Sequence, residues 1–407
     1  MIKTIALVFV FALFMGSTFG FGLDLISNLL PDIKTTFSLT DGDIGWVTGI
    51  GRLGFVAGAI IAGLLAAYIA PTLIVVLATL GCGATMVGLA NTNSATGVAV
   101  TIFLISVCTS LSWVPMTGVF SIFVSEGNRT KAFGAIIAGA GIGTSLAGLF
   151  SPYFVGNYSW REALMAAAAL TWVVVFVGLI VIAHFGILSK RNQVRQSVGE
   201  LAQQQRLRTY LDVRLGGILC MFFMVGFTVH PFQIFLSTYI RDELGFSVTV
   251  AGNTWLTIGL VGTWAGLFMG YLGDRFGIRN TMILASLLLV ASVLMLIEIH
   301  EPIWFLATAF VFSLAYYCMP GLLPAYLSIH YPAHISVQLF SAGGVILGLG
   351  TVIGNIIGGQ LSEWFLTLDA YYWACAFVSV ILALFALIFM LPAKKKVGTA
   401  ENCRIIG

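Results

Sequence analysis

The sequence contains few charged residues. Only 9% of its 407 residues are Asp, Glu, Lys or Arg, whereas an ordinary soluble domain carries about 25%. So few charges cannot cover the water-facing surface of a chain of this size, which excludes a soluble enzyme. The hydrophobic share is instead 59%, as expected for a protein that lies largely in a lipid bilayer.

Several kinds of motif are also missing. The chain has no Walker loop and no Rossmann glycine fingerprint, which argues against ATP-driven transport. It has no carboxylate pair, metal-ligand cluster, or nucleophile and base, so we expect no enzyme activity, no cofactor and no metal site. The net charge of +3 is too small, and the basic residues too scattered, to predict a nucleic-acid partner. The six cysteines suggest no disulfide framework.

Twelve apolar runs are long enough to cross a bilayer as helices. The first run continues through Leu30, which is too long for the core of a signal peptide. We therefore predict an all-α integral membrane protein with twelve transmembrane helices. The predicted spans are 4 to 30, 44 to 67, 72 to 91, 97 to 124, 132 to 155, 163 to 186, 215 to 239, 250 to 272, 280 to 298, 303 to 328, 339 to 361 and 371 to 392.

The basic residues predict the orientation of these spans. If the N-terminus is inside, fifteen basic residues fall on the inner side and only Lys34, Arg161 and Arg241 on the outer side. The positive-inside rule then makes both termini cytoplasmic. We expect a multi-pass protein of the plasma or inner membrane.

The chain divides into two halves of six spans. The basic loop 187–214 predicts a cytoplasmic linker between helix bundles 1–186 and 215–392, and 393–407 predicts a cytoplasmic tail. A shift of 207 positions sets Gly45 on Gly252 and Gly63 on Gly270. Such a repeat is typical of transporters whose two bundles bind substrate between them, near the membrane midplane.

One loop carries a recognisable motif. The segment Gly270-Tyr-Leu-Gly-Asp-Arg-Phe-Gly-Ile-Arg279 resembles the loop motif G-x-L-x-D-R-x-G-R-R of the major facilitator superfamily. With the six-plus-six division, this resemblance covers nearly the whole chain. It implies two rocking six-helix bundles and a cytoplasmic latch formed by Asp274, Arg275 and Arg279. Alternatively, Arg275 and Arg279 only enforce topology.

Two departures from the family pattern bear on the inner gate and on the drug-exporter alternative. The N-terminal copy of the motif has Ala67 and Tyr68 where the acid and the arginine belong, so an asymmetric inner gate is expected. The fourth span lacks the arginine, and the fifth lacks the central proline, that proton-driven drug exporters of this superfamily usually carry. The fifth span keeps its glycines, which favour close helix packing.

Two charged residues lie deep within predicted spans, Asp24 in the first and Arg52 in the second. Buried charges are costly and usually face a cavity with a partner. Counting from the outer helix ends puts both at similar depth, so a direct pair is plausible. Either Arg52 attracts an anionic substrate while Asp24 takes up a proton, or the two form a permanent salt bridge.

Further polar and aromatic residues are candidates for the same site. Asn28 shares a helical face with Asp24. His230 and Gln233 share a face of the seventh span, where His230 either titrates or satisfies carbonyls freed at Pro231. The remaining candidates are large or polar residues that could instead serve only packing: Trp113, Trp255, Tyr316, Tyr317, Pro320 and Asn355.

These observations favour a secondary active transporter that moves a small organic anion together with protons. The alternatives are an exporter of amphipathic or neutral compounds, and a non-transporting membrane sensor of the same fold. The expected partners are a small-molecule substrate, protons and the lipid bilayer, and the chain is expected to act as a monomer.

Overall fold

The computed structural model describes residues 2–66, 68–116, 119, 126–186, 212–331 and 333–391, and every regular element in these ranges is a helix. The N-terminal half contains α1 (Ile2–Met15), η1 (Gly16–Asp24), α2 (Leu25–Phe37), α3 (Asp41–Leu65), α4 (Pro71–Asn91), α5 (Ala95–Trp113), α7 (Glu126–Asn157) and α8 (Trp160–His184). The C-terminal half contains α10 (Val213–Thr238), η4 (Tyr239–Glu243), α11 (Val248–Phe276), α12 (Ile278–Glu298), α13 (Pro302–Tyr316), α14 (Met319–His330), α15 (Ala333–Phe365) and α16 (Asp369–Phe389). Most of the predicted linker and the predicted tail lie outside these ranges.

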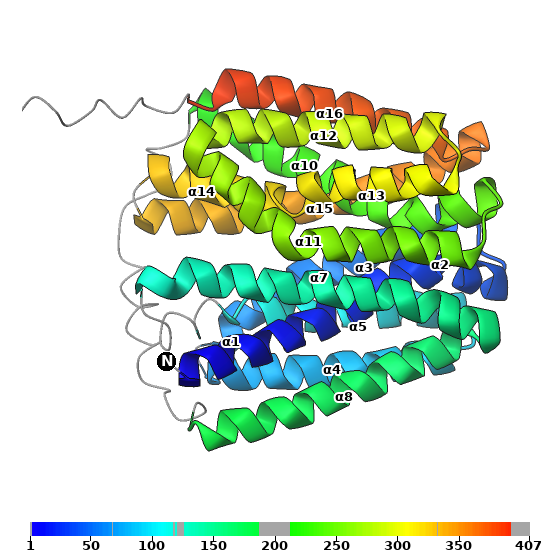
Figure 1. The fold of residues 1–407 in the computed structure, drawn as a ribbon, viewed down its shortest axis with the longest axis horizontal. Helices are drawn as coiled ribbons and strands as arrows, with labels where there is room; N and C mark the ends of the chain where they lie inside the picture. Colours follow the sequence, from blue (N-terminus) through cyan, green and yellow to red (C-terminus); the bar gives the residue numbers. More distant parts are fainter. Residues whose placement is uncertain are drawn as a thin grey trace, which may run out of the picture.

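The helices run side by side along the long axis of the molecule (Figure 1). They form twelve segments that are long and apolar enough to cross a membrane, which confirms the predicted number. Helix α1 begins and α16 ends at the same end of the molecule (Figure 1). We call this the terminal end, which the sequence predicts to be cytoplasmic, and the opposite end the distal end.

Short-range signals in the sequence set where the helices begin. Thr40 and Asp43 form a reciprocal capping box at the start of α3. Ser94 caps α5, and Pro71 occupies the first turn of α4, where its missing N–H is not needed. Large apolar side chains such as Phe176 stay exposed on the outer surface of the bundle, which suits contact with lipid rather than water.

Two predicted spans end too early. The first was predicted to stop at Leu30 before a proline, but α2 continues through Pro31 to Phe37. The seventh was predicted to stop at residue 239, but the helical segment reaches Glu243. The added turns are polar, so hydropathy does not detect them. They are held by ion pairs between the two halves, described below.

The tenth predicted span is broken rather than continuous. Helix α13 ends at Tyr316 and α14 begins at Met319, with proline in its first turn. Proline cannot donate the interior hydrogen bond of a helix because it has no N–H, so a new helix starts there. The break lies at the two tyrosines predicted to line the site.

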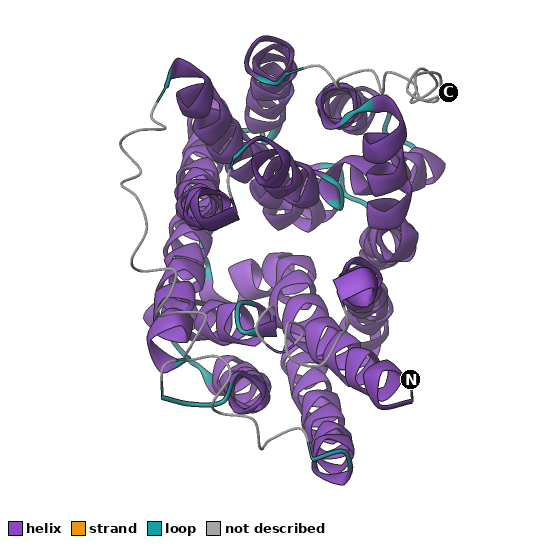
Figure 2. Cartoon of the chain, turned by 90° about the vertical axis from the view of Figure 1, so that its left-hand side faces the viewer, coloured by secondary structure: helices purple, strands orange, loops and turns teal. Residues whose placement is uncertain are grey.

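The two halves contact each other through pairs of helices, one helix from each half. Helix α3 packs against α15 and α7 packs against α11, while α2 contacts α10. Viewed from the terminal end, the helices are seen end-on in an upper and a lower group (Figure 2). The interfaces between the halves therefore lie along the sides of the molecule.

The glycines of the sequence repeat mark where these interfaces are tight. A Cβ on Gly45 would lie 2.6 Å from the backbone oxygen of Asn355, and one on Gly252 would lie 2.5 Å from the oxygen of Gly148. The second pair of the repeat, Gly63 and Gly270, lies near the terminal end and has nothing within 4 Å. The repeat thus records close helix contact between the halves on the distal side.

Candidate functional site

Asp24 is positioned by the packing of the first membrane segment on α7. The nine-residue π-helix η1 ends at Asp24, and such segments often occur at functional sites. A Cβ on Gly20 would lie 2.2 Å from the carbonyl carbon of Gly143, so the two backbones touch. One turn after Gly20, the Asp24 carboxylate accepts a hydrogen bond of 2.5 Å from the Thr144 hydroxyl. The Tyr317 hydroxyl lies 3.4 Å from the same Thr144 oxygen.

Arg52 approaches this group from α3. It lies within electrostatic reach of Asp24, Tyr316 and His230. Its guanidinium makes no hydrogen bond or ion pair with any residue that the structure describes. The side chain is partly exposed although it lies inside a span.

The predicted direct pair between Asp24 and Arg52 is not formed. The ion pairs found among the described residues do not include it. The reason is the helix packing, because η1 is pressed against α7 while α3 packs on α5 and α15. Equal depth along two helices does not fix the direction in which their side chains point.

The C-terminal half contributes His230, Gln233 and Tyr316. The His230 ring meets Tyr316 edge-on, with centroids 5.8 Å apart and an interplanar angle of 84°. Gln233 lies beside the Tyr316 hydroxyl. Neither His230 Nδ1 nor Gln233 Nε2 has a hydrogen-bond partner among the described residues. The structure therefore brings six of the predicted residues together: Asp24, Arg52, His230, Gln233, Tyr316 and Tyr317.

The other predicted residues lie around this group. Asn28 accepts a hydrogen bond of 2.8 Å from Ser237. Asn355 is fully buried on α15. Trp113 packs edge-on against Phe19, with centroids 6.2 Å apart, in an apolar cluster with α1. Their contact with substrate stays a prediction.

Sequence reasoning missed Thr144 and Ser237. Both are small polar residues inside apolar runs, Thr144 within a glycine-rich segment and Ser237 within α10. Thr and Ser often bond only to the carbonyl one turn earlier in their own helix, so their positions do not identify a site. A signal was present in the glycines before Thr144, which imply that another backbone approaches there.

At the terminal end, the predicted latch residues form no hydrogen bond or ion pair between the halves with any residue that the structure describes. Asp274 and Arg275 are exposed, and Arg275 donates to the Tyr271 hydroxyl one turn earlier in α11. Arg279 donates to the Leu387 carbonyl of α16 at 2.9 Å. All of these contacts stay within the C-terminal half.

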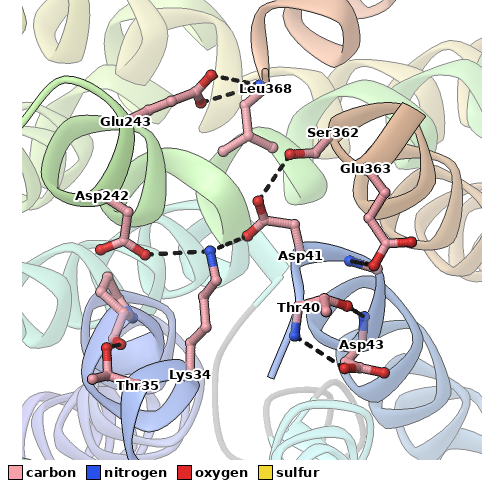
Figure 3. A network of polar contacts seen from close by, with 12 residues as sticks. Lys34, Thr35, Thr40, Asp41, Asp43, Asp242, Glu243, Ser362, Glu363 and Leu368 are labelled. Carbon is pink, nitrogen blue, oxygen red and sulfur yellow. Dashed lines mark hydrogen bonds and ion pairs between the residues drawn. The ribbon is translucent and has the colours of Figure 1, made fainter. Parts of the chain in front are cut away.

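At the distal end, by contrast, charged side chains join the halves (Figure 3). Arg241 donates two hydrogen bonds to Asp32, at 2.6 and 2.8 Å. Lys34 lies between Asp41 at 2.5 Å and Asp242 at 3.5 Å. We call the residues that form these contacts, together with two partners on α15, the distal lock: Asp32, Lys34, Asp41, Arg241, Asp242, Ser362 and Glu363.

The two α15 residues of the distal lock form hydrogen bonds with the start of α3. Ser362 donates to the Asp41 carboxylate at 2.9 Å, and the Gly42 amide donates to Glu363 at 3.2 Å. A Cβ at Gly42 would occupy the space of the Glu363 carboxylate, so a larger residue there would displace that side chain. From the sequence, Lys34 and Arg241 indicated only which ends of the spans lie outside. Their position next to acidic residues in both halves was an available signal.

The sequence matches a family model described as the Major Facilitator Superfamily over residues 10–335 and 218–404. The chain belongs to this superfamily. It is 21% identical over 391 residues to the cis,cis-muconate transport protein of Acinetobacter baylyi, covering 91% of this chain and 92% of that protein.

Solved superfamily structures have the same fold. A D-xylose-proton symporter gives a TM-score of 0.76 at 15% identity, covering 96% of this chain and 98% of that chain. A mutant nucleoside transporter also gives 0.76, at 14% identity, covering 95% and 99%. The predicted superfamily, the all-α fold with twelve membrane helices and the transporter class are thus confirmed. The chain is a multi-pass membrane protein from a family of transporters of small molecules.

Proposed function

We propose that this superfamily member carries a small organic anion across the membrane together with protons. The observation that carries the proposal is Arg52, a guanidinium inside a span that has no partner among the described residues and lies within electrostatic reach of Asp24, Tyr316 and His230. An unpaired charge inside a membrane protein is costly. An anionic substrate group is the natural partner for it, since Arg binds carboxylates through two parallel hydrogen bonds.

Asp24 is the proposed proton carrier. It is 8% exposed and is held by the neutral Thr144 hydroxyl rather than by a cation. A buried carboxylate without a counter-ion can be neutralised by a proton. Because Asp24 lies within electrostatic reach of Arg52, proton uptake by Asp24 would remove a negative charge that repels the anion at Arg52. The absence of an ion pair between the two residues speaks against a permanent structural salt bridge.

Residues 1–186 and 215–392 are proposed to move as two bundles around this site, with the terminal end in the cytoplasm. The distal lock then holds the outer side closed, and the terminal latch acts in the opposite state. One relative is named a cis,cis-muconate transport protein. Muconate is an organic acid, so this name supports the same substrate class here.

Uptake and exchange by the purified protein in proteoliposomes test this function. Asp24→Asn should abolish uptake driven by a pH gradient but preserve exchange of substrate for substrate, because exchange moves no net proton. Arg52→Ala should lose binding of organic anions, while Arg52→Lys should retain part of it since the charge is kept. Transport of anions by Arg52→Ala at the wild-type rate would exclude the anion site. Uptake of neutral compounds only would favour the exporter alternative.

A further inference from the structure

Three buried amide side chains beside the Arg52 site have polar atoms without partners. They are Asn28 on α2, Gln233 on α10 and Asn355 on α15, each at most 2% exposed. Among the described residues, no partner is found for Asn28 Nδ2, for Gln233 Nε2 or for either polar atom of Asn355. Buried polar groups are normally paired. Three unpaired amides in one region indicate a partner that is not part of the protein.

Hydrogen bonding determines which atom of Asn28 is unpaired. Trp255 Nε1 donates to Ser237 Oγ at 2.8 Å, and Ser237 is also 2.8 Å from Asn28 Oδ1. An indole N–H can only donate, so the Ser237 hydroxyl proton is left for the Asn28 oxygen. The amide nitrogen of Asn28 therefore keeps two unused N–H donors. Its orientation is fixed by this chain of bonds.

The three amides belong to one layer of the molecule. Ser237 follows Gln233 by one helical turn on the same face of α10, and Asn28 bonds to Ser237. On α15, Gly354 packs so closely on α10 that a Cβ would lie 2.8 Å from Pro231 Cγ. Asn355, the next residue, is thus level with the turn of α10 that carries Gln233.

Arg52 lies on the terminal side of this layer. Gly45 of α3 packs against the Asn355 carbonyl and Gly49 against Ile356. Since α3 runs from the distal to the terminal end, Arg52 follows these contacts by three to seven residues, roughly 5 to 10 Å along the helix. A small molecule with polar groups at both ends can span this separation.

We propose that Asn28, Gln233 and Asn355 form a second subsite, which binds an oxygen acceptor at the far end of the organic anion held by Arg52. This rests on the proposed function, and it narrows the substrate class to acids with a second oxygen-bearing group. The subsite supplies neutral N–H donors, so it accepts a carboxylate, a carbonyl or a hydroxyl oxygen. An acid with a plain hydrocarbon tail leaves the donors unpaired and binds less well.

Three six-carbon acids distinguish these cases: hexanoate, 6-hydroxyhexanoate and adipate. Their dissociation constants are measured on the full-length protein in detergent by ligand-dependent thermal shift. Adipate or 6-hydroxyhexanoate should bind at least tenfold more tightly than hexanoate. Tighter binding of adipate would identify the second group as charged, and tighter binding of 6-hydroxyhexanoate would identify it as neutral.

The variant Asn355→Leu tests whether the amides cause this preference. It removes two unpaired polar atoms without breaking a hydrogen bond, so folding should be preserved. The preference over hexanoate should fall to about twofold or less, with hexanoate binding unchanged. The control Thr351→Val, one turn away on α15, removes a buried hydroxyl that bonds only to its own helix and should keep the full preference.

The outcomes separate the two proposals. If hexanoate binds as tightly as the other acids, or if Asn355→Leu keeps the preference, the second subsite is wrong. If Arg52→Ala still binds all three acids, the anion site itself is wrong. Loss of all binding in Arg52→Ala, with the preference lost in Asn355→Leu, supports both.

Discussion

The two ends of the interface between the halves differ in how their charges are used. At the distal end, Asp32 pairs with Arg241 and Lys34 approaches Asp242, each bond crossing from one half to the other. At the terminal end, Arg275 and Arg279 bond only within the C-terminal half, and Asp274 is exposed. Both ends carry charged residues suited to closing a gate. Among the residues that the structure describes, the distal end is therefore the one held closed by charged contacts between the halves.

The glycines show the same difference between the ends. On α3, Gly45 touches α15, whereas Gly63 near the terminal end has no neighbour within 4 Å. On α11, Gly252 and Gly270 repeat this pattern. Backbone contact and ion pairing thus close the same end, so they act together on one equilibrium. The predictions below alter one end at a time.

Reversing one charge of the distal lock should have the largest effect. Asp32→Arg opposes Arg241 with a like charge and removes a two-bond pair whose side chains are only 15% and 17% exposed. Loss of this charged pair should destabilise the distal-closed state by about 1.5 to 3 kcal/mol. This would lower the ratio of distal-closed to distal-open protein at least tenfold. Spin labels at Asn93 and Glu301 lie in exposed loops of the two halves. The distance between them, measured by pulsed electron paramagnetic resonance, should increase.

The double variant Asp32→Arg with Arg241→Asp is the control for this prediction. It restores the opposite charges in exchanged positions, so the short distance between Asn93 and Glu301 should return. If Asp32→Arg alone keeps the wild-type distance distribution, the pair does not hold the distal end closed.

An intermediate effect is expected from adding one methyl group at the helix contact. In Gly45→Ala the new Cβ would lie 2.6 Å from the Asn355 backbone oxygen, and such overpacking costs about 1 to 3 kcal/mol. Gly63→Ala on the same helix has free space and should raise stability by about 0.5 to 1 kcal/mol. Thermal unfolding in detergent should therefore move in opposite directions for the two variants, and equal shifts would contradict the packing difference.

The smallest effect is expected at the terminal end. Asp274→Asn removes a charge that has no partner across the halves among the described residues, so the distance between labels at Asn93 and Glu301 should not change. If the latch acts in the opposite state, labels at Tyr68 and Asn280 should lose their short-distance population. An unchanged distribution at both ends would leave Asp274 with a topological role only.

The helices and the family were predictable from the sequence because their signals are local. Twelve apolar runs and the motif ending at Arg279 require no knowledge of tertiary contacts, and both predictions are confirmed. The helix ends were less predictable. The last turns of α2 and the segment η4 are polar, and they exist as helix in part because Asp32 and Arg241 bind each other.

The candidate site shows the same division. Asp24 and Arg52 were identified from the cost of a charge within an apolar run, which is a property of the sequence alone. The direction in which their side chains point could not be predicted from the sequence. The contact of Gly20 with Gly143 turns Asp24 toward Thr144 on α7. The unpaired state of Arg52 follows from this packing and could not be read from depth along two helices.

The sequence by itself determined the class of the protein, the number of its membrane helices and the residues costly enough to need a partner. Composition and helix length decide these properties, since the bilayer has a fixed thickness and a fixed cost for charge. Only the tertiary structure decided which charges pair, that the distal end is closed, and that Asn28, Gln233 and Asn355 share one layer. These depend on how residues up to several hundred positions apart are brought together, and on side-chain directions that helical periodicity does not specify between helices.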